Sequence, residues 1–171
     1  AHQLNGCFIA GNLENAKMLP VTAKMLSGSW KSLAETNSLQ KSFGPRMGQL
    51  WTSGTPGDTL RFTFKGSLAK VYDLVGPNGG KVKITVDGKV TANSVPRFDS
   101  YCTYHRIATL GVAANLDPTA THTVEIEILT EQPDRSILLP KVKSPDELKQ
   151  PKYTGTCAWF SQLMLIGDLA Q

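Results

Sequence analysis

Three short runs of alternating apolar and polar residues constrain the fold of this chain more than any other feature. They lie at 59–65, 68–75 and 81–86 and are separated by glycine, proline and asparagine. In the first run Leu60 and Phe62 fall on one face, and polar residues fall on the other. Side chains along a strand point to alternate faces, so the pattern predicts a sheet with one buried and one solvated face. The chain is therefore a candidate β-sandwich.

Further segments of the same kind follow. Tyr101–Val112 is apolar enough for a central strand bent at Gly111, His122–Leu129 alternates again, and Cys157–Leu169 closes the chain as an apolar strand. About eight strands with glycine- and proline-rich turns predict an all-β, two-layer antiparallel sandwich with little helix. A jelly roll is the preferred form, and an immunoglobulin-like sandwich is the alternative. The long polar segment Pro133–Pro151 is expected to be a functional or flexible loop.

The sequence predicts one main domain. The chain has 171 residues, enough to bury a core without a metal or a disulfide. We expect residues 1–26 to form an N-terminal tail or linker, with one or two helical turns ending at Pro20, and residues 27–171 to form the sandwich. Short strands are predicted at Ser27–Leu33 and Gly44–Trp51.

The net charge of +4 and the pI of about 9.0 do not by themselves indicate a nucleic-acid partner. The basic residues are scattered and form no run or recognised module, so nucleic-acid binding is not expected. No apolar stretch reaches the length of a membrane-spanning helix. The first residues lack the order of a secretory signal peptide, which a mature or excised chain would also lack.

Neither the cysteines nor the acidic residues form a metal-site pattern. Cys7, Cys102 and Cys157 are far apart, and none belongs to a CxxC pair. We expect buried thiols, with one internal disulfide as the alternative. Loop carboxylates could hold a structural Ca²⁺, but no DxDxDG-like loop is present. The prediction is no cofactor and no metal.

The densest group of chemically active residues lies between Arg97 and Arg106. Asp99, Ser100 and His105 together suggest a catalytic triad, in which a serine passes its proton to an oriented imidazole. If this segment is a strand, however, Ser100 and His105 point to opposite faces. The sequence therefore predicts no catalytic residue here.

A ligand-binding interpretation of the same segment is stronger. In a strand, Tyr101 and His105 share one face, and Tyr104 and Arg106 share the other. Aromatic faces stack on sugar rings, and arginine suits a carboxylate, so an acidic sugar fits this set. The candidate ligand-binding residues are Arg97, Asp99, Tyr101, Tyr104, His105, Arg106 and, from another strand, Trp51.

A structural interpretation of these residues stays open. The tyrosine rings would then pack against their neighbours, and the arginine would pair with a carboxylate such as Asp73 or Asp99. The three tryptophans, Trp51 among them, would be core or interface residues. His122 begins a strand after a turn, where a solvent or backbone contact is expected.

Four blocks of sequence occur in a characteristic order. They read GDTLRFTFKGSLAKVYDLVGPNGGKVKITVDG, RFDSYCTYHRIATLGVAANL, HTVEIEIL and LMLIGD. Together, from Trp30 to Asp168, they resemble a β-sandwich module that flanks the catalytic domain of bacterial SGNH (GDSL-type) hydrolases, including carbohydrate esterases. The strongest marks are GD before FxFxG, the VDG hairpin, and an arginine-containing strand before HTV.

This resemblance implies a jelly roll that packs on an esterase domain or binds sugars beside it, in a protein exported from a bacterial cell. It transfers no catalytic residue. The hydrolases use a Gly-Asp-Ser block and an Asp-x-x-His pair, whereas neither Gly-Asp pair here, at 57–58 and 167–168, precedes a serine. No histidine follows an aspartate at that spacing.

The expected function is thus a non-catalytic accessory module of a carbohydrate-active SGNH-type hydrolase. Its expected partners are the catalytic domain or a glycan. Two alternatives remain: an ester hydrolase completed by a partner chain or a missing domain, and a purely structural protein-interaction domain.

Overall fold

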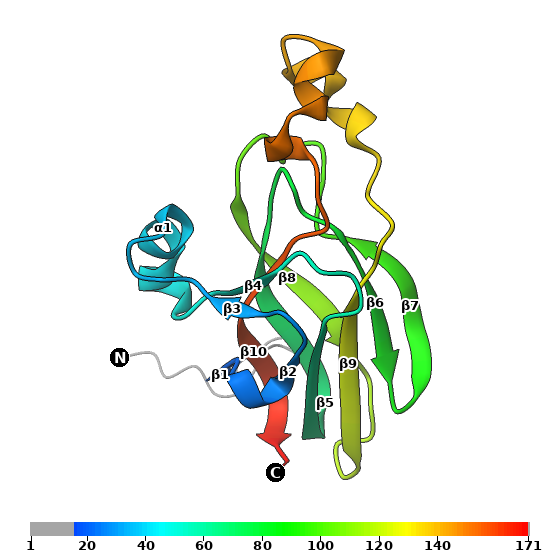
Figure 1. The fold of residues 1–171 in the computed structure, drawn as a ribbon. Coiled ribbons are helices and arrows are strands. Elements are labelled where there is room, and N and C mark those ends of the chain that lie inside the picture. Colours follow the sequence, from blue (N-terminus) through cyan, green and yellow to red (C-terminus); the bar gives the residue numbers. More distant parts are fainter. Residues whose placement is uncertain (1–15, 171) are drawn as a thin grey trace, which may run out of the picture.

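The structure, a computed structural model, describes residues 16–170 and consists mainly of antiparallel strands (Figure 1). The ten strands of this part are β1 (Lys17–Pro20), β2 (Leu26–Ser27), β3 (Lys31–Ser32), β4 (Trp51–Ser53), β5 (Thr59–Val75), β6 (Lys81–Val86), β7 (Lys89–Pro96), β8 (Arg106–Ala113), β9 (Thr121–Ile128) and β10 (Ala158–Leu169). The helices are α1 (Ser38–Met47) and the short 3-10 helices η1 (Ala23–Met25), η2 (Arg135–Lys141), η3 (Pro145–Lys149) and η4 (Pro151–Tyr153). No helix within residues 16–170 is both long and apolar enough to cross a membrane.

The long strand β5 connects the two layers of the sandwich. It pairs with β9 over residues 59–65 and with β8 over residues 69–75, while β10 follows its other edge. The runs at 59–65 and 68–75 are expected to be separate strands with a turn at Gly66 between them; this is wrong, because one strand bends there and continues. A Cβ atom on Gly66 would lie 2.2 Å from the Ile166 carbonyl oxygen, beside a bulge at Ile166–Gly167, so a side chain would prevent this close approach.

The core lies between the layers, as the alternation predicts. Inward residues of β5, β6 and β9 meet those of β8 and β10 in one cluster. Its fully buried members include Leu60, Phe64, Val71, Ile126, Phe160, Leu163 and Leu165. The predicted all-β antiparallel sandwich is confirmed.

The N-terminal part of the described chain differs from the prediction. Lys17–Pro20 is not helical but forms strand β1 on the edge of β10, and Val21 is buried in the core. The sandwich therefore includes residues before 27. Residues 1–15, the rest of the predicted tail, lie outside the described part, as does Cys7.

The segment before β4 also differs. The predicted strand Gly44–Trp51 is wrong, because helix α1 occupies Ser38–Met47 and only Trp51–Ser53 is extended. The Asn37 side chain caps this helix by accepting a hydrogen bond from the Leu39 amide at 2.9 Å. The predicted strand Ser27–Leu33 is divided into β2 and β3.

Candidate ligand-binding site

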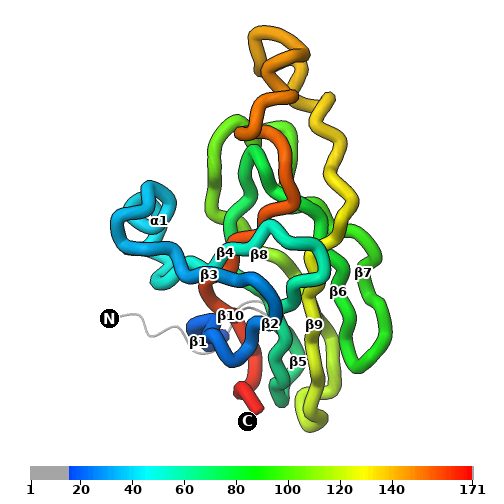
Figure 2. Tube along the Cα trace, in the orientation of Figure 1, coloured from blue at the N-terminus to red at the C-terminus, as the bar shows by residue number. Residues whose placement is uncertain are grey.

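Two segments far apart in sequence meet at one end of the sandwich (Figures 1 and 2). The tip loop, residues 97–105, connects β7 to β8, and the cap, residues 133–156, carries η2, η3 and η4. Buried residues from both join a second apolar cluster, separate from the main core. Its members are Val75, Phe98, Cys102, Leu138 and Tyr153. The predicted polar loop is thus a folded cap with its own apolar contacts.

Arg135 fastens the cap to the sandwich. Its guanidinium donates to the carbonyl oxygens of Pro77 and Gly79, both at 2.7 Å, and of Gly155 at 3.1 Å. It also lies 4.2 Å above the Phe98 ring. Within residues 16–170 it forms no ion pair. Burial lowers the pKa of Arg135 to about 10, which still leaves it charged at neutral pH.

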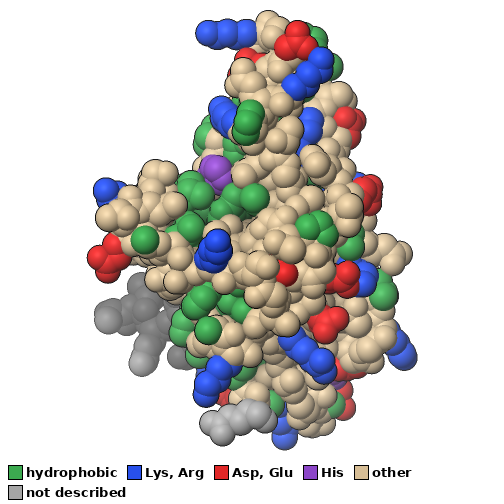
Figure 3. All heavy atoms as spheres, viewed as in Figure 1, with side chains coloured by type: hydrophobic (Ala, Val, Ile, Leu, Met, Phe, Trp, Pro, Cys, Tyr) green, Lys and Arg blue, Asp and Glu red, His purple; other side chains and the backbone are tan. Residues whose placement is uncertain are grey.

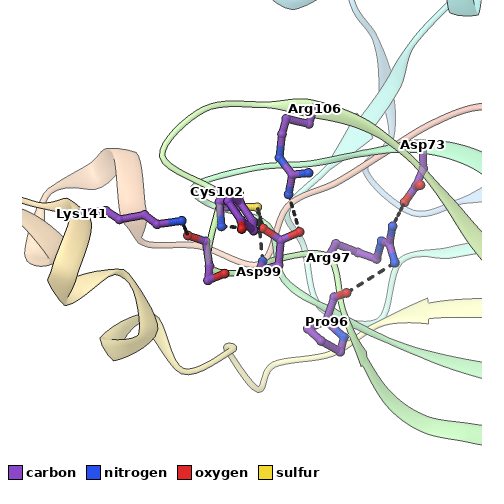
Figure 4. A network of polar contacts seen from close by, with 9 residues as sticks. Asp73, Pro96, Arg97, Asp99, Cys102, Arg106 and Lys141 are labelled. Atoms are coloured by element: carbon purple, nitrogen blue, oxygen red, sulfur yellow. Dashed lines mark hydrogen bonds and ion pairs between the residues drawn. The ribbon is translucent and has the colours of Figure 1, made fainter.

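A buried ion pair lies beneath the tip loop (Figure 4). Arg97 Nη2 is 2.6 Å from Asp73 Oδ2, and the two side chains are 7% and 0% exposed. Burial raises the pKa of Asp73 to about 6, although the charge of Arg97 and its hydrogen bond act in the opposite direction. Arg97 therefore faces inward, and the candidate site does not include it.

Asp99 sets the shape of the tip loop. Its carboxylate accepts a hydrogen bond from the Tyr101 amide at 2.7 Å and pairs with the guanidinium of Arg106 (Figure 4). Burial alone would raise the pKa of Asp99, but the hydrogen bonds from Tyr101 and Arg106 outweigh it and hold the pKa below its ordinary value. The expected pairing of an arginine with Asp99 is present.

The predicted strand Tyr101–Val112 is wrong in its first part, because β8 begins only at Arg106 and the preceding residues form turns. The sharing of faces inferred for a strand therefore does not apply. His105 packs edge-on against Trp159, with ring centroids 4.7 Å apart, and lies against Gly76. Burial, helped by the charge of Lys152, lowers the pKa of His105. This imidazole is partly buried, and its buried Nε2 has no hydrogen-bond partner among the described residues.

Tyr101 and Tyr104 are the two candidate residues that face solvent, each 59% exposed. The ammonium of Lys141, from the end of η2, lies 3.6 Å from the centroid of the Tyr101 ring and donates to the Ser100 carbonyl at 2.5 Å. The Arg106 guanidinium is 5.6 Å from the same ring. Sequence reasoning missed Lys141, since only the folding of the cap brings it to the tip loop.

Trp51 does not belong to this site. It is half-buried on β4, and its indole donates to the Val21 carbonyl at 3.0 Å. Trp30 stacks on Phe160 at 5.2 Å, and Trp159 is buried, so the tryptophans pack in or against the core clusters. The structural interpretation holds for them.

The remaining candidates have structural contacts. His122 bonds Asp87 through Nδ1 at 2.8 Å and the Asp117 carbonyl through Nε2 at 3.0 Å, which includes the expected backbone contact. Cys102 and Cys157 are not joined to each other. In residues 16–170 no group of three or more His, Cys, Asp or Glu residues could hold a metal ion.

Solved structures show what this fold is similar to, although no protein-family model and no curated protein matches the chain. A two-domain esterase active on acetylated mannans, co-crystallised with mannopentaose, gives a TM-score of 0.64 at 11% identity over 99% of this chain and 41% of its own. An acetyl xylan esterase from the rumen bacterium Butyrivibrio proteoclasticus gives 0.53 at 10% identity, over 91% and 33%. A family two carbohydrate esterase from Cellvibrio japonicus gives 0.50 at 15% identity, over 90% and 34%.

These likenesses concern the fold. The chain spans between a third and about two fifths of the length of each of those proteins. The resemblance to a β-sandwich domain of carbohydrate esterases, expected from the sequence, is confirmed at that level.

Proposed function

We propose that this chain is a non-catalytic accessory module of an exported, carbohydrate-active SGNH-type hydrolase, and that it contacts glycans through the tip loop. The observation that carries the proposal is the exposure of Tyr101 and Tyr104 on a loop that is otherwise held in place. Burying such a ring against the apolar face of a sugar removes nonpolar surface from water. The fold likeness to solved esterases supports the part of the proposal that concerns association with a carbohydrate-active hydrolase.

The tip loop is suited to this role because its shape is fixed before any ligand arrives. Asp99 holds the loop from within, and Arg106 anchors it to the start of β8. A pre-ordered loop loses less conformational entropy on binding than a flexible one. Tyr104, which has no cation over its ring among the described residues, offers the less obstructed face.

A glycan screen with a paired set of variants tests the proposal. We expect the full chain to be retarded in native gels containing xylan, mannan or another target polysaccharide. Tyr104→Ala should lose the retardation, whereas Val90→Ala, which truncates a 51% exposed side chain on β7, should keep it. Equal binding by both variants would place the glycan elsewhere. Absence of retardation by every polysaccharide would favour the protein-interaction alternative.

Packing on a catalytic domain is the second part of the proposal. It is supported by Ile137 and Leu139, which are 43% and 44% exposed on η2 although both are large and apolar. Adding a separately produced SGNH catalytic domain should give a complex, and Ile137→Asp should weaken it. If Ile137→Asp leaves the affinity of the complex unchanged, this part of the proposal is contradicted.

The enzyme alternative is tested separately. No hydrogen bond joins the Ser100 hydroxyl to the His105 imidazole among residues 16–170; the imidazole packs against Trp159, and its Nε2 has no partner there, so the two residues form no nucleophile and base pair in the structure. We therefore expect no turnover of an acetyl ester by the chain. Turnover abolished by a serine-directed inhibitor would contradict the accessory role.

A further inference from the structure

Lys141 carries a charge that the structure leaves uncompensated. Its ammonium contacts the π face of Tyr101 and the Ser100 carbonyl, and no carboxylate lies within ion-pair distance of it in the described residues. An ammonium has three donors, so at least one is left for a ligand. The two contacts hold the group in position at an exposed ring.

A second cation lies beside Lys141. Arg106 lies over the same ring and pairs with Asp99, so two cations border the Tyr101 ring and only Arg106 has a carboxylate partner there. In the cap, Lys152 lies 4.9 Å from the Tyr153 ring and also has no ion-pair partner in the described residues. Lys and Arg side chains protrude from this end of the molecule beside Asp and Glu side chains (Figure 3), among which Lys149 pairs with Asp146.

The exposed face of the sheet shows the opposite arrangement. There Lys81 pairs with Glu131 and Lys83 with Glu127, so cation and carboxylate alternate and cancel. Lys141 differs from other cations without a carboxylate partner in the described residues, such as Lys89 on β7, because its ammonium is held both against an aromatic ring and by a carbonyl oxygen. An anion near the tip would supply the missing countercharge.

We propose that the tip selects glycans that carry anionic groups, with Lys141 as the residue that binds the anion and Arg106 as a second cation beside it. This inference rests on the proposed glycan-binding function and adds the substrate class. A carboxylate of a uronic acid and a sulfate ester share the required chemistry, since each presents oxygens that accept charge-assisted hydrogen bonds. The sugar ring that carries the group would stack on Tyr104.

The test uses ligand pairs that differ only in charge. The uronate pair is polygalacturonate and its fully methyl-esterified form, and the sulfate pair is a sulfated galactan and its desulfated form. Binding is measured by affinity electrophoresis and calorimetry at low and high salt. We expect at least one charged form to bind more tightly than its neutral partner, and the preference to fall as salt screens the charges.

Variants of the chain distinguish a specific anion site at Lys141 from nonspecific electrostatic attraction to exposed lysines. Lys141→Gln should weaken binding of the preferred anionic form about tenfold, the effect of losing one hydrogen bond to a charged group, and should not change binding of the neutral form. Lys141→Arg should retain the preference. Lys89→Gln, an exposed lysine on β7, should have no effect.

The outcomes distinguish this inference from the function on which it rests. Binding of neutral and charged forms with equal affinity, abolished by Tyr104→Ala, would overturn the anionic preference and leave glycan binding intact. Equal weakening by Lys141→Gln and Lys89→Gln would also overturn it, because the attraction would then be nonspecific. Failure to bind any of the four polymers or the neutral glycans of the first screen would overturn both.

Discussion

The sandwich body and the cap, which meet at the tip loop, are held together by different forces. The body has a large main apolar cluster, to which both layers contribute, and a smaller one beneath α1. The cap shares a small cluster with the loops beneath it and adds Arg135, whose charge is met by carbonyl oxygens and an aromatic ring. The buried pair of Asp73 and Arg97 lies where the two regions join.

This difference determines how each region should respond to the loss of a contact. Apolar packing is non-directional, so the body spreads the loss of one contact over many neighbours. The cap depends on a few directional contacts, so a single substitution can open it while the body stays folded. The tip loop, and with it the proposed site, depends on both.

The largest effect is expected in the body. Phe64 is fully buried and packs near Phe62 and His122, so Phe64→Ala leaves a cavity in the main core. The free energy of unfolding should fall by about 3–5 kcal/mol, measured by urea denaturation. Val90→Ala, at an exposed position, should change it by no more than about 0.5 kcal/mol. Similar losses for the two variants would show that the apolar cluster does not dominate the stability of the body.

The next effect tests the junction. Arg97→Met leaves the Asp73 carboxylate buried without a countercharge, which should cost about 3–5 kcal/mol at neutral pH, somewhat less if water enters. The loss should shrink as the pH falls, because Asp73 is then neutral in the folded protein. A loss that is the same at every pH would contradict the role of the pair.

Asp73→Asn is the matched control for that variant. Because burial raises the folded pKa of Asp73 from 3.8 to about 6, its contribution to stability is complete below the unfolded pKa and is lost as the pH rises through the folded one. The wild-type protein should therefore lose stability between about pH 4 and pH 6. An asparagine side chain cannot titrate, so the variant should lack this slope. An unchanged slope would assign it to another group.

The body was largely predictable because local pattern and tertiary environment agree there. Val82, Ile84 and Val86 were expected to share a buried face, and they are 1%, 2% and 6% exposed. Helix α1 was missed because Gly44-Pro45 is a typical turn pair, yet it lies inside the helix. In that case tertiary context outweighed local propensity.

The site could be predicted only in part. Tyr101 and Tyr104 are candidates from the sequence and are exposed in the structure, but the segment resembles a strand, and its turns depend on the contacts of Asp99. Lys141 could not be placed from sequence, because its position depends on the way Arg135 docks the cap some distance away. Contacts between distant segments through backbone carbonyls leave no pattern in the sequence.

A smaller global effect is expected at Arg135. Arg135→Met removes three hydrogen bonds to carbonyl oxygens, and opening of the cap should become easier by about 1–3 kcal/mol. Hydrogen exchange should accelerate in residues 134–156 while the amides of β5 and β9 stay protected. Arg135→Lys keeps the positive charge but lacks the planar, forked donors of the guanidinium, so its exchange rates in the cap should lie between those of the wild type and Arg135→Met. Uniform acceleration over body and cap would show that they unfold as one unit.

The smallest effect is expected at the far end of the body, where His122 links the Asp87-Gly88 turn to the loop before β9. The hydrogen bond that His122 donates to the Asp87 carboxylate and the contact with the Asp117 carbonyl raise the pKa of His122, since a protonated imidazole can donate to both. Its stabilising contribution is therefore complete below pH 6.5, the ordinary pKa, and is lost as the pH rises through the raised value. His122→Gln should be less stable than the wild type in mildly acid solution, and the difference should narrow at higher pH.

Denaturation midpoints measured across this range separate His122 from Asp73, whose contribution is already lost at about pH 6. Asp87→Asn is the matched control, because it removes the partner of His122 and leaves the imidazole. If the two residues act as a pair, the double variant should lose less than the sum of the single losses. A pH-independent difference for His122→Gln, or full additivity with Asp87→Asn, would show that this end of the body does not depend on a charged histidine and is held, like the core, by packing.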